Sequence, residues 1–382
     1  MSSRMSFKRR WDIFCTVIDN YGDIGVCWRL AKLLVQVHQQ AVRLWVDDLA
    51  ALQKLHPNTQ IDQAKQWLEG VEVCHWTSRA FDMVSMGDVA EVVIEAFGCE
   101  LPIQYQQAMG QKGEASCVWI NLEYLTAEPW AAECHGLGAL QNNGVKRHFF
   151  FPGMTKGTGG LMCEPDYEVR RMEFLNSLTL QQRFCQRWNL PFDGLDDAIK
   201  VSLFAYENQG LLGLLDAFKN SSRRVVAFLP EGKLLNDLNA QLGLSLQAGQ
   251  TWQTAQLTLV VMPFLPQAAY DELLWLCDLN FVRGEESFVR AQLAAKPFVW
   301  HIYPTEDQAH FDKLDAFLAI YPTLAILKQA NVAWNQEQWH LEHWHTMVNV
   351  LPELLESAES WQNSIKQLGE LSENLMTFAK KL

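Results

Sequence analysis

The sequence predicts an α/β protein with two parallel β-sheets, and three observations support this. Short apolar runs rich in β-forming residues alternate with segments of helical periodicity, which is typical of right-handed βαβ units. The alternation breaks in a glycine- and proline-rich stretch and starts again near residue 199, which indicates a second domain of similar design. With 382 residues, the chain is also long enough for more than one domain of about 150 residues.

The N-terminal half contains the first series of elements. Strands are expected at residues 11–18, 41–46, 71–75, 89–96 and 117–122, and helices at 26–38, 49–55 and 101–109. A long loop is expected at 149–160, where the threonines, lysine and glycines lack the residue order of a P-loop and match a phosphate site only weakly. A helical segment at 167–188 and a linker at 189–194 follow.

The C-terminal half repeats the pattern. Strands are expected at residues 199–206, 224–229, 257–262, 279–282 and 297–302, and helices at 210–219, 268–276, 287–294 and 307–320. The tail at 351–382 is expected to be helical and could cross back to pack on the first domain.

The composition of the chain limits which binding partners and which cellular location we expect. A net charge of −13 argues against binding to nucleic acid, which depends on clustered lysine and arginine, and suits a basic partner group. No apolar stretch is long enough to cross a membrane, and the N-terminus lacks the pattern of a signal peptide. The nine cysteines are scattered and include no Cys-x-x-Cys pair, which predicts reduced thiols and a cytoplasmic protein.

The stretch at residues 18–30 joins the first strand to the first helix and carries two acids. Asp19 and Asp23 lie four residues apart around Gly22, so a tight turn can direct both carboxylates to the edge of the sheet where open α/β folds bind ligands. The plain alternative is an Asx turn with a helix cap, because Asn20 and Asp23 suit both. Polar residues at 95–98 and 121–125 also follow strands, and we expect them along the same edge.

A second polar turn follows the strand at 279–282. Arg283 to Ser287 open a helix, whose first amide groups and positive dipole suit a phosphate. Glu285 and Glu286 are unusual beside an anion unless they face a sugar hydroxyl or a cationic acceptor. The alternative is that both acids only interact with the helix dipole.

Aromatic residues end two other strands of the second half. Tyr206 and Phe264 could enclose a nucleobase beside the phosphate site, although most large apolar side chains at strand ends are simply core. His340, His343 and His345 lack the acid or cysteine of a familiar zinc motif, so no metal site is predicted. Domains that bind nicotinamide dinucleotides usually have a Gly-x-Gly-x-x-Gly motif after the first strand. This chain has only Gly22 and Gly25 there, which disfavours a nicotinamide cofactor.

Taken together, these motifs resemble the EarP family, the protein-arginine rhamnosyltransferases that modify bacterial translation elongation factor P. The resemblance spans nearly the whole chain, although Glu286 stands where the family usually has aspartate. It is carried by residues 11–15, 17–30, 121–125, 150–155, 158–161 and 283–292.

The resemblance implies a GT-B fold, with two Rossmann-like domains facing each other across a cleft. It implies an acceptor-binding domain at 1–190, to which a helix at about 362–382 could return, and a nucleotide-sugar-binding domain at 195–361. The implied reaction moves L-rhamnose from dTDP-β-L-rhamnose to an arginine of elongation factor P, with inversion and without a metal or other cofactor. No direct contact with nucleic acid or membrane is implied.

The resemblance also implies roles for individual residues. Asp19, Asp23 and Glu285 would be the catalytic acids. The substrate-binding residues would be Asn20, Tyr21, Gly22, Tyr206, Phe264, Gln267, Arg283, Gly284, Glu286 and Ser287.

The chemistry of arginine explains why such a site needs paired acids. A guanidinium stays protonated and spreads its charge over three nitrogens, so carboxylates must orient it and take a proton. We expect Asp23 to be the base, Asp19 to grip the guanidinium, and Glu285 to organise the donor or acceptor. A sugar-nucleotide epimerase of the same architecture and a non-catalytic module for a basic partner remain as alternatives.

Overall fold

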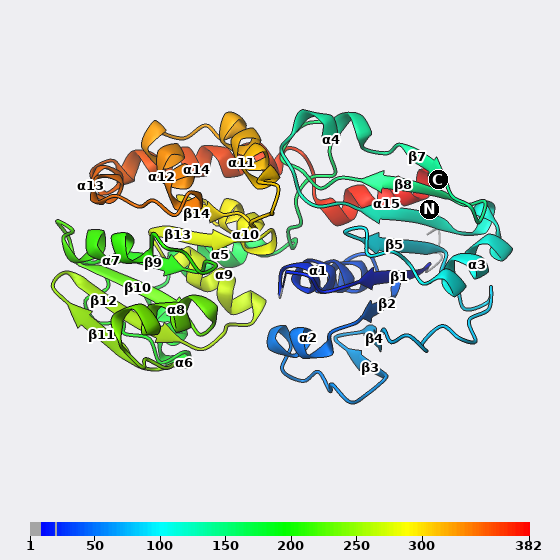
Figure 1. The fold of residues 1–382 in the computed structure, drawn as a ribbon, viewed down its shortest axis with the longest axis horizontal. Helices are drawn as coiled ribbons and strands as arrows, with labels where there is room; N and C mark the ends of the chain where they lie inside the picture. The colour runs from blue at the N-terminus through cyan, green and yellow to red at the C-terminus, as the bar shows by residue number, and fades with distance from the viewer. Residues whose placement is uncertain (1–8, 20) are drawn as a thin grey trace, which may run out of the picture. The chain divides into compact units, whose positions relative to one another are not determined.

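The computed structural model describes residues 9–19 and 21–382, and the chain divides into two compact units (Figure 1). Unit 1 comprises Met1–Cys163 and Ile365–Leu382, and unit 2 comprises Glu164–Ser364. The division therefore falls well before the linker expected at 189–194. The reason is that α5 (Tyr167–Leu175) and α6 (Leu178–Arg187) pack on α9 (Gln267–Leu276), where Trp275 Nε1 donates to the Tyr167 hydroxyl at 2.8 Å.

Unit 1 is built around a mixed sheet that is parallel in its centre. Its strand order in the described chain is β3-β4-β2-β1-β5-β6-β8-β7, with β3 and β7 antiparallel at the edges. The strands are β1 (Arg10–Cys15), β2 (Ala41–Val46), β3 (Lys65–Leu68), β4 (Val71–His75), β5 (Val92–Ala96), β6 (Val118–Leu122), β7 (Gly138–Leu140) and β8 (Lys146–Phe150).

Helix α1 packs on this sheet, where it contacts β1, β2 and β4. The longest of the N-terminal helices, α1, buries Leu30 and Leu34 fully. The helices are α1 (Gly22–Gln36), α2 (Leu49–Leu55), α3 (Ile103–Lys112), α4 (Pro129–Cys134) and, from the C-terminus, α15 (Leu371–Lys381). α1 and α15 are in contact, and the end of the chain belongs to unit 1.

The glycine-rich loop after β8 has a packing role. A Cβ atom on Gly160 would lie 2.4 Å from the carbonyl oxygen of Gly369, and Asn374 Nδ2 donates to the Gly159 carbonyl at 3.0 Å. Leu161 also forms a parallel bridge with Glu370. The glycines therefore allow close contact with the C-terminal segment, which accounts for them without a phosphate.

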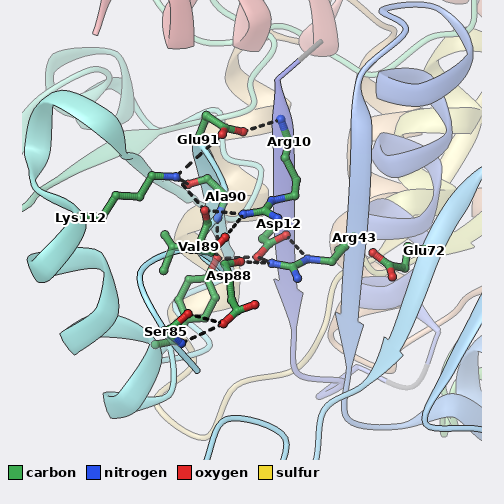
Figure 2. Close-up of polar contacts among 12 residues, drawn as sticks. Arg10, Asp12, Arg43, Glu72, Ser85, Asp88, Val89, Ala90, Glu91 and Lys112 are labelled. Carbon is green, nitrogen blue, oxygen red and sulfur yellow. Dashed lines mark hydrogen bonds and ion pairs between the residues drawn. The ribbon is translucent and has the colours of Figure 1, made fainter. Parts of the chain in front are cut away.

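A buried polar cluster lies at the N-terminal end of β1 (Figure 2). Asp12 is fully buried, and its Oδ1 accepts from Arg43 Nε at 2.7 Å while the Tyr105 hydroxyl donates to its Oδ2. Arg10 and Lys112 donate to the Val89 carbonyl, each at 2.7 Å. Arg43 Nη2 also donates to the Asp88 carbonyl, so cations from β1, β2 and α3 all bind the segment that leads into β5.

Unit 2 repeats the parallel design with a smaller sheet. Its strand order in the described chain is β11-β12-β10-β9-β13-β14, and only β11 is antiparallel to its neighbour there. The strands are β9 (Ile199–Leu203), β10 (Val225–Pro230), β11 (Thr251–Thr254), β12 (Leu257–Met262), β13 (Leu279–Arg283) and β14 (Phe298–His301).

The helices of unit 2 flank this sheet and extend beyond it. The additional ones are α7 (Leu211–Lys219), α8 (Lys233–Leu242), α10 (Glu286–Leu293), α11 (Ala309–Ile320), α12 (Ala325–Asn335), α13 (Leu341–Asn349) and α14 (Leu351–Lys366). Strands β3, β7, β8 and β11 and helices α4, α8, α12 and α13 were not among the elements that the sequence predicts, and the segment at 167–188 forms α5 and α6 rather than one helix.

One further finding concerns membranes. Among the described residues, none of the helices combines the length and the apolar character that a bilayer crossing requires.

Candidate active site

The site in unit 1 lies where the strand order of its sheet reverses. Strand β1 has β2 on one side and β5 on the other, both parallel to it. Ligands of open α/β sheets bind at this position, beyond the C-terminal ends of the strands. The β1–α1 loop, which carries Asp19, therefore lies at the position expected for a ligand site. The segment that follows β6 begins at the same end of the sheet.

Asp23 is the organising side chain of this loop. It is 3% exposed, and its Oδ2 accepts from the backbone N–H groups of Ile18 at 2.8 Å and of Asp19 at 2.9 Å. The Tyr124 hydroxyl, from the segment after β6, donates a further hydrogen bond to it. Burial raises the pKa of the Asp23 carboxyl, and the negative charge of Asp19 acts in the same direction.

The capping alternative does not describe this arrangement. Asp23 is in the first turn of α1, yet its carboxylate accepts from the preceding loop rather than from the helix amides. Two acids are thus held beside each other, one buried and one half-buried. Tyr21 lies at the start of α1, whereas Asn20 lies outside the described residues.

Gly22 is required by the close approach of Asp19. A Cβ atom at position 22 would lie 2.8 Å from Asp19 Oδ2, and the Gly22 N–H donates to the Asp19 carbonyl at 2.6 Å. The glycine therefore fixes where the half-buried carboxylate can lie.

This contact predicts that Gly22→Ala displaces the Asp19 carboxylate while the fold persists, since the contacted atom ends a side chain. We expect kcat/KM for the acceptor to fall about 10- to 100-fold, in line with the cost of misplacing a reacting group by about 1 Å. The thermal midpoint should stay near that of the wild type. Gly87→Ala is the matched control, because its Cβ atom would meet nothing nearer than Ser85 Oγ at 3.7 Å. Equal activity of the two variants would contradict the assignment.

The site in unit 2 occupies the corresponding position. Strand β9 lies between β10 and β13, so its C-terminal end is again the point where the strand order reverses. Arg283, at the end of β13, places its guanidinium carbon 4.5 Å from the ring centroid of Phe204 and 4.7 Å from that of Tyr206. A cation stacked on two aromatic rings forms a platform at the C-terminal edge of the sheet.

The turn after Arg283 is fixed by side-chain hydrogen bonds. The Arg283 N–H donates to Ser287 Oγ at 2.9 Å, and the Ser287 hydroxyl donates back to the Arg283 carbonyl. Gln267 Nε2 donates to Glu286 Oε1 at 3.0 Å. Gly284 adopts a φ of 57° and is buried, which allows the chain to turn sharply into α10.

Comparison with known proteins places the chain in a family. A model described as "Elongation-Factor P (EF-P) rhamnosyltransferase EarP" matches residues 11–380. The chain belongs to the EarP family. The protein-arginine rhamnosyltransferase of Pseudomonas putida strain KT2440 is 43% identical over 361 residues, covering 93% of this chain and 94% of the relative.

Similar solved structures include a member of the EarP family and support the fold class. One, described as "Structural basis for EarP-mediated arginine glycosylation of translation elongation factor EF-P", matches with a TM-score of 0.68 and 30% identity over 98% of this chain and 99% of the other. The spinosyn rhamnosyltransferase SpnG matches with a TM-score of 0.51 and 11% identity over 96% and 99% of the two chains, which supports the fold alone. The EarP-family chain thus has the GT-B fold class that the resemblance implied.

The structure brings the residues predicted in this EarP-family chain into two groups. Asp19, Tyr21, Gly22 and Asp23 lie in the β1–α1 region of unit 1. The predicted residues of unit 2 all lie at or beyond the C-terminal ends of β9, β12 and β13: Tyr206, Phe264, Gln267, Arg283, Gly284, Glu285, Glu286 and Ser287.

Four residues beside these groups were not among the predicted site residues, although Tyr124 lies in the stretch 121–125 that was expected along the edge with Asp19. Tyr124 contacts Asp23, and Lys313 lies 2.9 Å from Glu285. His301 and Tyr303 each meet the Tyr206 ring edge-on, at centroid distances of 5.2 and 5.7 Å. Burial, and then the charge of Arg283, lower the pKa of His301 to about 3, so its imidazole is neutral. Tyr124 and Tyr303 follow strands and His301 is the last residue of β14, so position near a strand end was the available signal for these three, but Lys313 lies within α11.

Two other expectations concern residues away from these groups. Glu95, expected along the edge with Asp19, is buried within β5 and accepts from Trp119 Nε1 at 3.0 Å, because the strand continues past it to Ala96.

The histidine cluster lies at the start of α13, where the His340 N–H donates to His343 Nδ1 at 3.3 Å. Within residues 9–19 and 21–382, His, Cys, Asp and Glu side chains form no group of three arranged to hold a metal ion.

Proposed function

We propose that this protein is a protein-arginine rhamnosyltransferase that moves L-rhamnose from dTDP-β-L-rhamnose to an arginine side chain of translation elongation factor P. The reaction inverts the anomeric carbon and needs no metal or other cofactor. Family membership and the activity of the Pseudomonas putida relative support rhamnosyl transfer to arginine. The EarP structure, which concerns arginine glycosylation of EF-P, supports the choice of acceptor.

The observation that carries the proposal is the pair of acids after β1. A carboxylate whose pKa is raised by burial is a better proton acceptor, and Asp23 meets this condition. Asp19, half-buried and positioned by Gly22, can hold a guanidinium by charge-assisted hydrogen bonds. Asp23 would then take the proton as the arginine nitrogen attacks the anomeric carbon.

The donor would be held by unit 2. Arg283 and the first amide groups of α10 suit the diphosphate, and Tyr206 and Phe264 suit the thymine base. As the bond between the sugar and the diphosphate breaks, negative charge collects on the leaving group, and these positive groups stabilise it. The sugar passes through a cation-like state, and attack from the opposite face gives the inverted product.

The test uses the purified full-length protein with dTDP-β-L-rhamnose and folded elongation factor P. Intact-protein mass spectrometry should show one deoxyhexose on the acceptor, fragmentation should place it on an arginine, and NMR should show the α-anomer. Activity should persist in excess chelator. Acceptor that stays unmodified would contradict the transferase; conversion of the nucleotide sugar without any acceptor would favour an epimerase, and acceptor binding without turnover would favour a docking module.

The donor assignment predicts that Arg283→Met weakens binding of dTDP. A hydrogen bond to a charged group contributes about 1.5–3 kcal/mol, so we expect the dissociation constant to rise roughly 10- to 150-fold. Isothermal titration calorimetry measures this directly. Arg223→Met is the control, because Arg223 is an exposed arginine that precedes β10 and so lies at the opposite edge of the sheet. Similar affinities for the two variants would show that Arg283 does not hold the diphosphate.

A further inference from the structure

Glu285 occupies a position where the negative charge of an acid would normally repel a bound phosphate. It is the N-cap residue of α10, and carboxylates there usually accept from the first helix amides. Within the described residues, however, its side chain makes no capping hydrogen bond to α10. The carboxylate is turned toward another element instead.

That element is α11, which supplies Lys313. Its ammonium nitrogen lies 2.9 Å from Glu285 Oε1, and the two side chains are 22% and 16% exposed. Partial burial makes such a pair stronger than one at the surface, because solvent screens it less. The pair joins the start of α10 to α11, which is the next helix along the chain.

We propose that Lys313 is a positioning residue for the transfer reaction: by holding the Glu285 carboxylate, it keeps the first turn of α10 available to the diphosphate. This inference rests on the proposed function. Without the ammonium group, the carboxylate would be able to cap the helix and would repel the donor. The pair also explains how an acid can belong to a site that binds an anion, since Lys313 offsets its charge.

The balance of charge around the turn supports this role. Glu285 and Glu286 bring two negative charges to the start of α10, and Arg283 and Lys313 bring two positive ones. Gln267 donates to Glu286, and Lys313 forms an ion pair with Glu285. Removing Lys313 would leave the turn with an excess of negative charge where the diphosphate must bind.

A double-mutant cycle tests the proposal with dTDP as the probe, titrated calorimetrically against the full-length protein. We expect Lys313→Met to weaken dTDP binding about 5- to 30-fold, in line with the free energy of a charge at a helix N-terminus. Glu285→Gln should bind dTDP at least as tightly as the wild type. The double variant should behave like Glu285→Gln, because the lysine then has no carboxylate to hold.

Two further variants complete the test. Lys313→Arg should restore most of the affinity, and Asp315→Asn, which changes an exposed charge on the same helix, should leave it unchanged. Unchanged affinity in Lys313→Met would overturn the proposal. A double variant as weak as Lys313→Met would also overturn it, since the lysine would then contact the diphosphate itself. Rhamnosyl transfer by the wild type is measured separately, so failure of the proposed function is distinguishable from failure of this inference.

Discussion

Asp23→Asn is expected to abolish most transfer without lowering stability. Loss of a general base reduces kcat by about 10²- to 10⁴-fold. The asparagine carbonyl can still accept from the Ile18 and Asp19 amides, so the loop should keep its shape. Single-turnover kinetics with saturating donor and acceptor measures the chemical step, and differential scanning fluorimetry follows the thermal midpoint.

The sign of the stability effect follows from the pKa of Asp23. Because the folded state raises this pKa, the folded protein binds the proton more tightly than the unfolded chain does. This group's contribution to stability is therefore greatest below its unfolded pKa and declines as pH rises through the folded value. At neutral pH the buried charge costs stability, so asparagine should leave the midpoint equal or higher.

Activity should depend on pH in the opposite direction. A base must be deprotonated, so kcat should fall as pH drops through the raised pKa of Asp23. Asp47→Asn is a suitable control, since Asp47 also accepts a loop amide, that of Val17 at 2.9 Å, but is not assigned to the chemistry. An Asp23→Asn variant that turns over normally would show that another group takes the proton.

Arg290→Met is expected to have the largest effect on stability. Arg290 is 1% exposed; its Nε and Nη2 donate to the two oxygens of the fully buried Asp271, each at 2.7 Å. Its Nη2 also lies 2.9 Å from Glu164, and its guanidinium carbon lies 4.4 Å from the Tyr167 ring centroid. Removing one partner of a buried ion pair costs about 3–5 kcal/mol, because the other charge remains buried. Urea unfolding measures the loss.

A double variant distinguishes the effect of losing the Arg290–Asp271 ion pair from the effect of losing side-chain packing. Arg290→Met combined with Asp271→Leu removes both charges, and we expect it to recover much of the lost stability. Arg170→Met is the control, because Arg170 is more exposed and its Nη2 lies 4.0 Å from Oε2 of the same Glu164. This substitution should lower the free energy of unfolding by at most about 1 kcal/mol. An Arg290→Met variant as stable as this control would contradict a structural role for the buried pair.

Three strands inside the two sheets were predicted best. Residues 41–46, 71–75 and 257–262 were expected as strands and form β2, β4 and β12 with those bounds. β12 is buried along nearly its whole length and β2 at alternate residues, and both patterns are local signals of a strand. Edge strands such as β3 and β7 are short and half-exposed, so their composition differs little from that of a loop.

The division of the chain shows a limit of local patterns. A proline and glycine near 189–194 indicated a linker, yet the units meet at Cys163 and Glu164. That position depends on α5 packing against α9, including Tyr167 with Trp275. Packing between segments about 100 residues apart leaves no local signal in the sequence.

The sequence by itself determined the repeated α/β design, the family motifs and the acids after the first strand, because strand periodicity and turn residues are local properties. The tertiary structure decided what those acids touch: Asp23 is buried against loop amides and Tyr124, and Glu285 is turned toward Lys313. Burial and partners set the pKa and orientation of a carboxylate, and both depend on residues that only folding brings together.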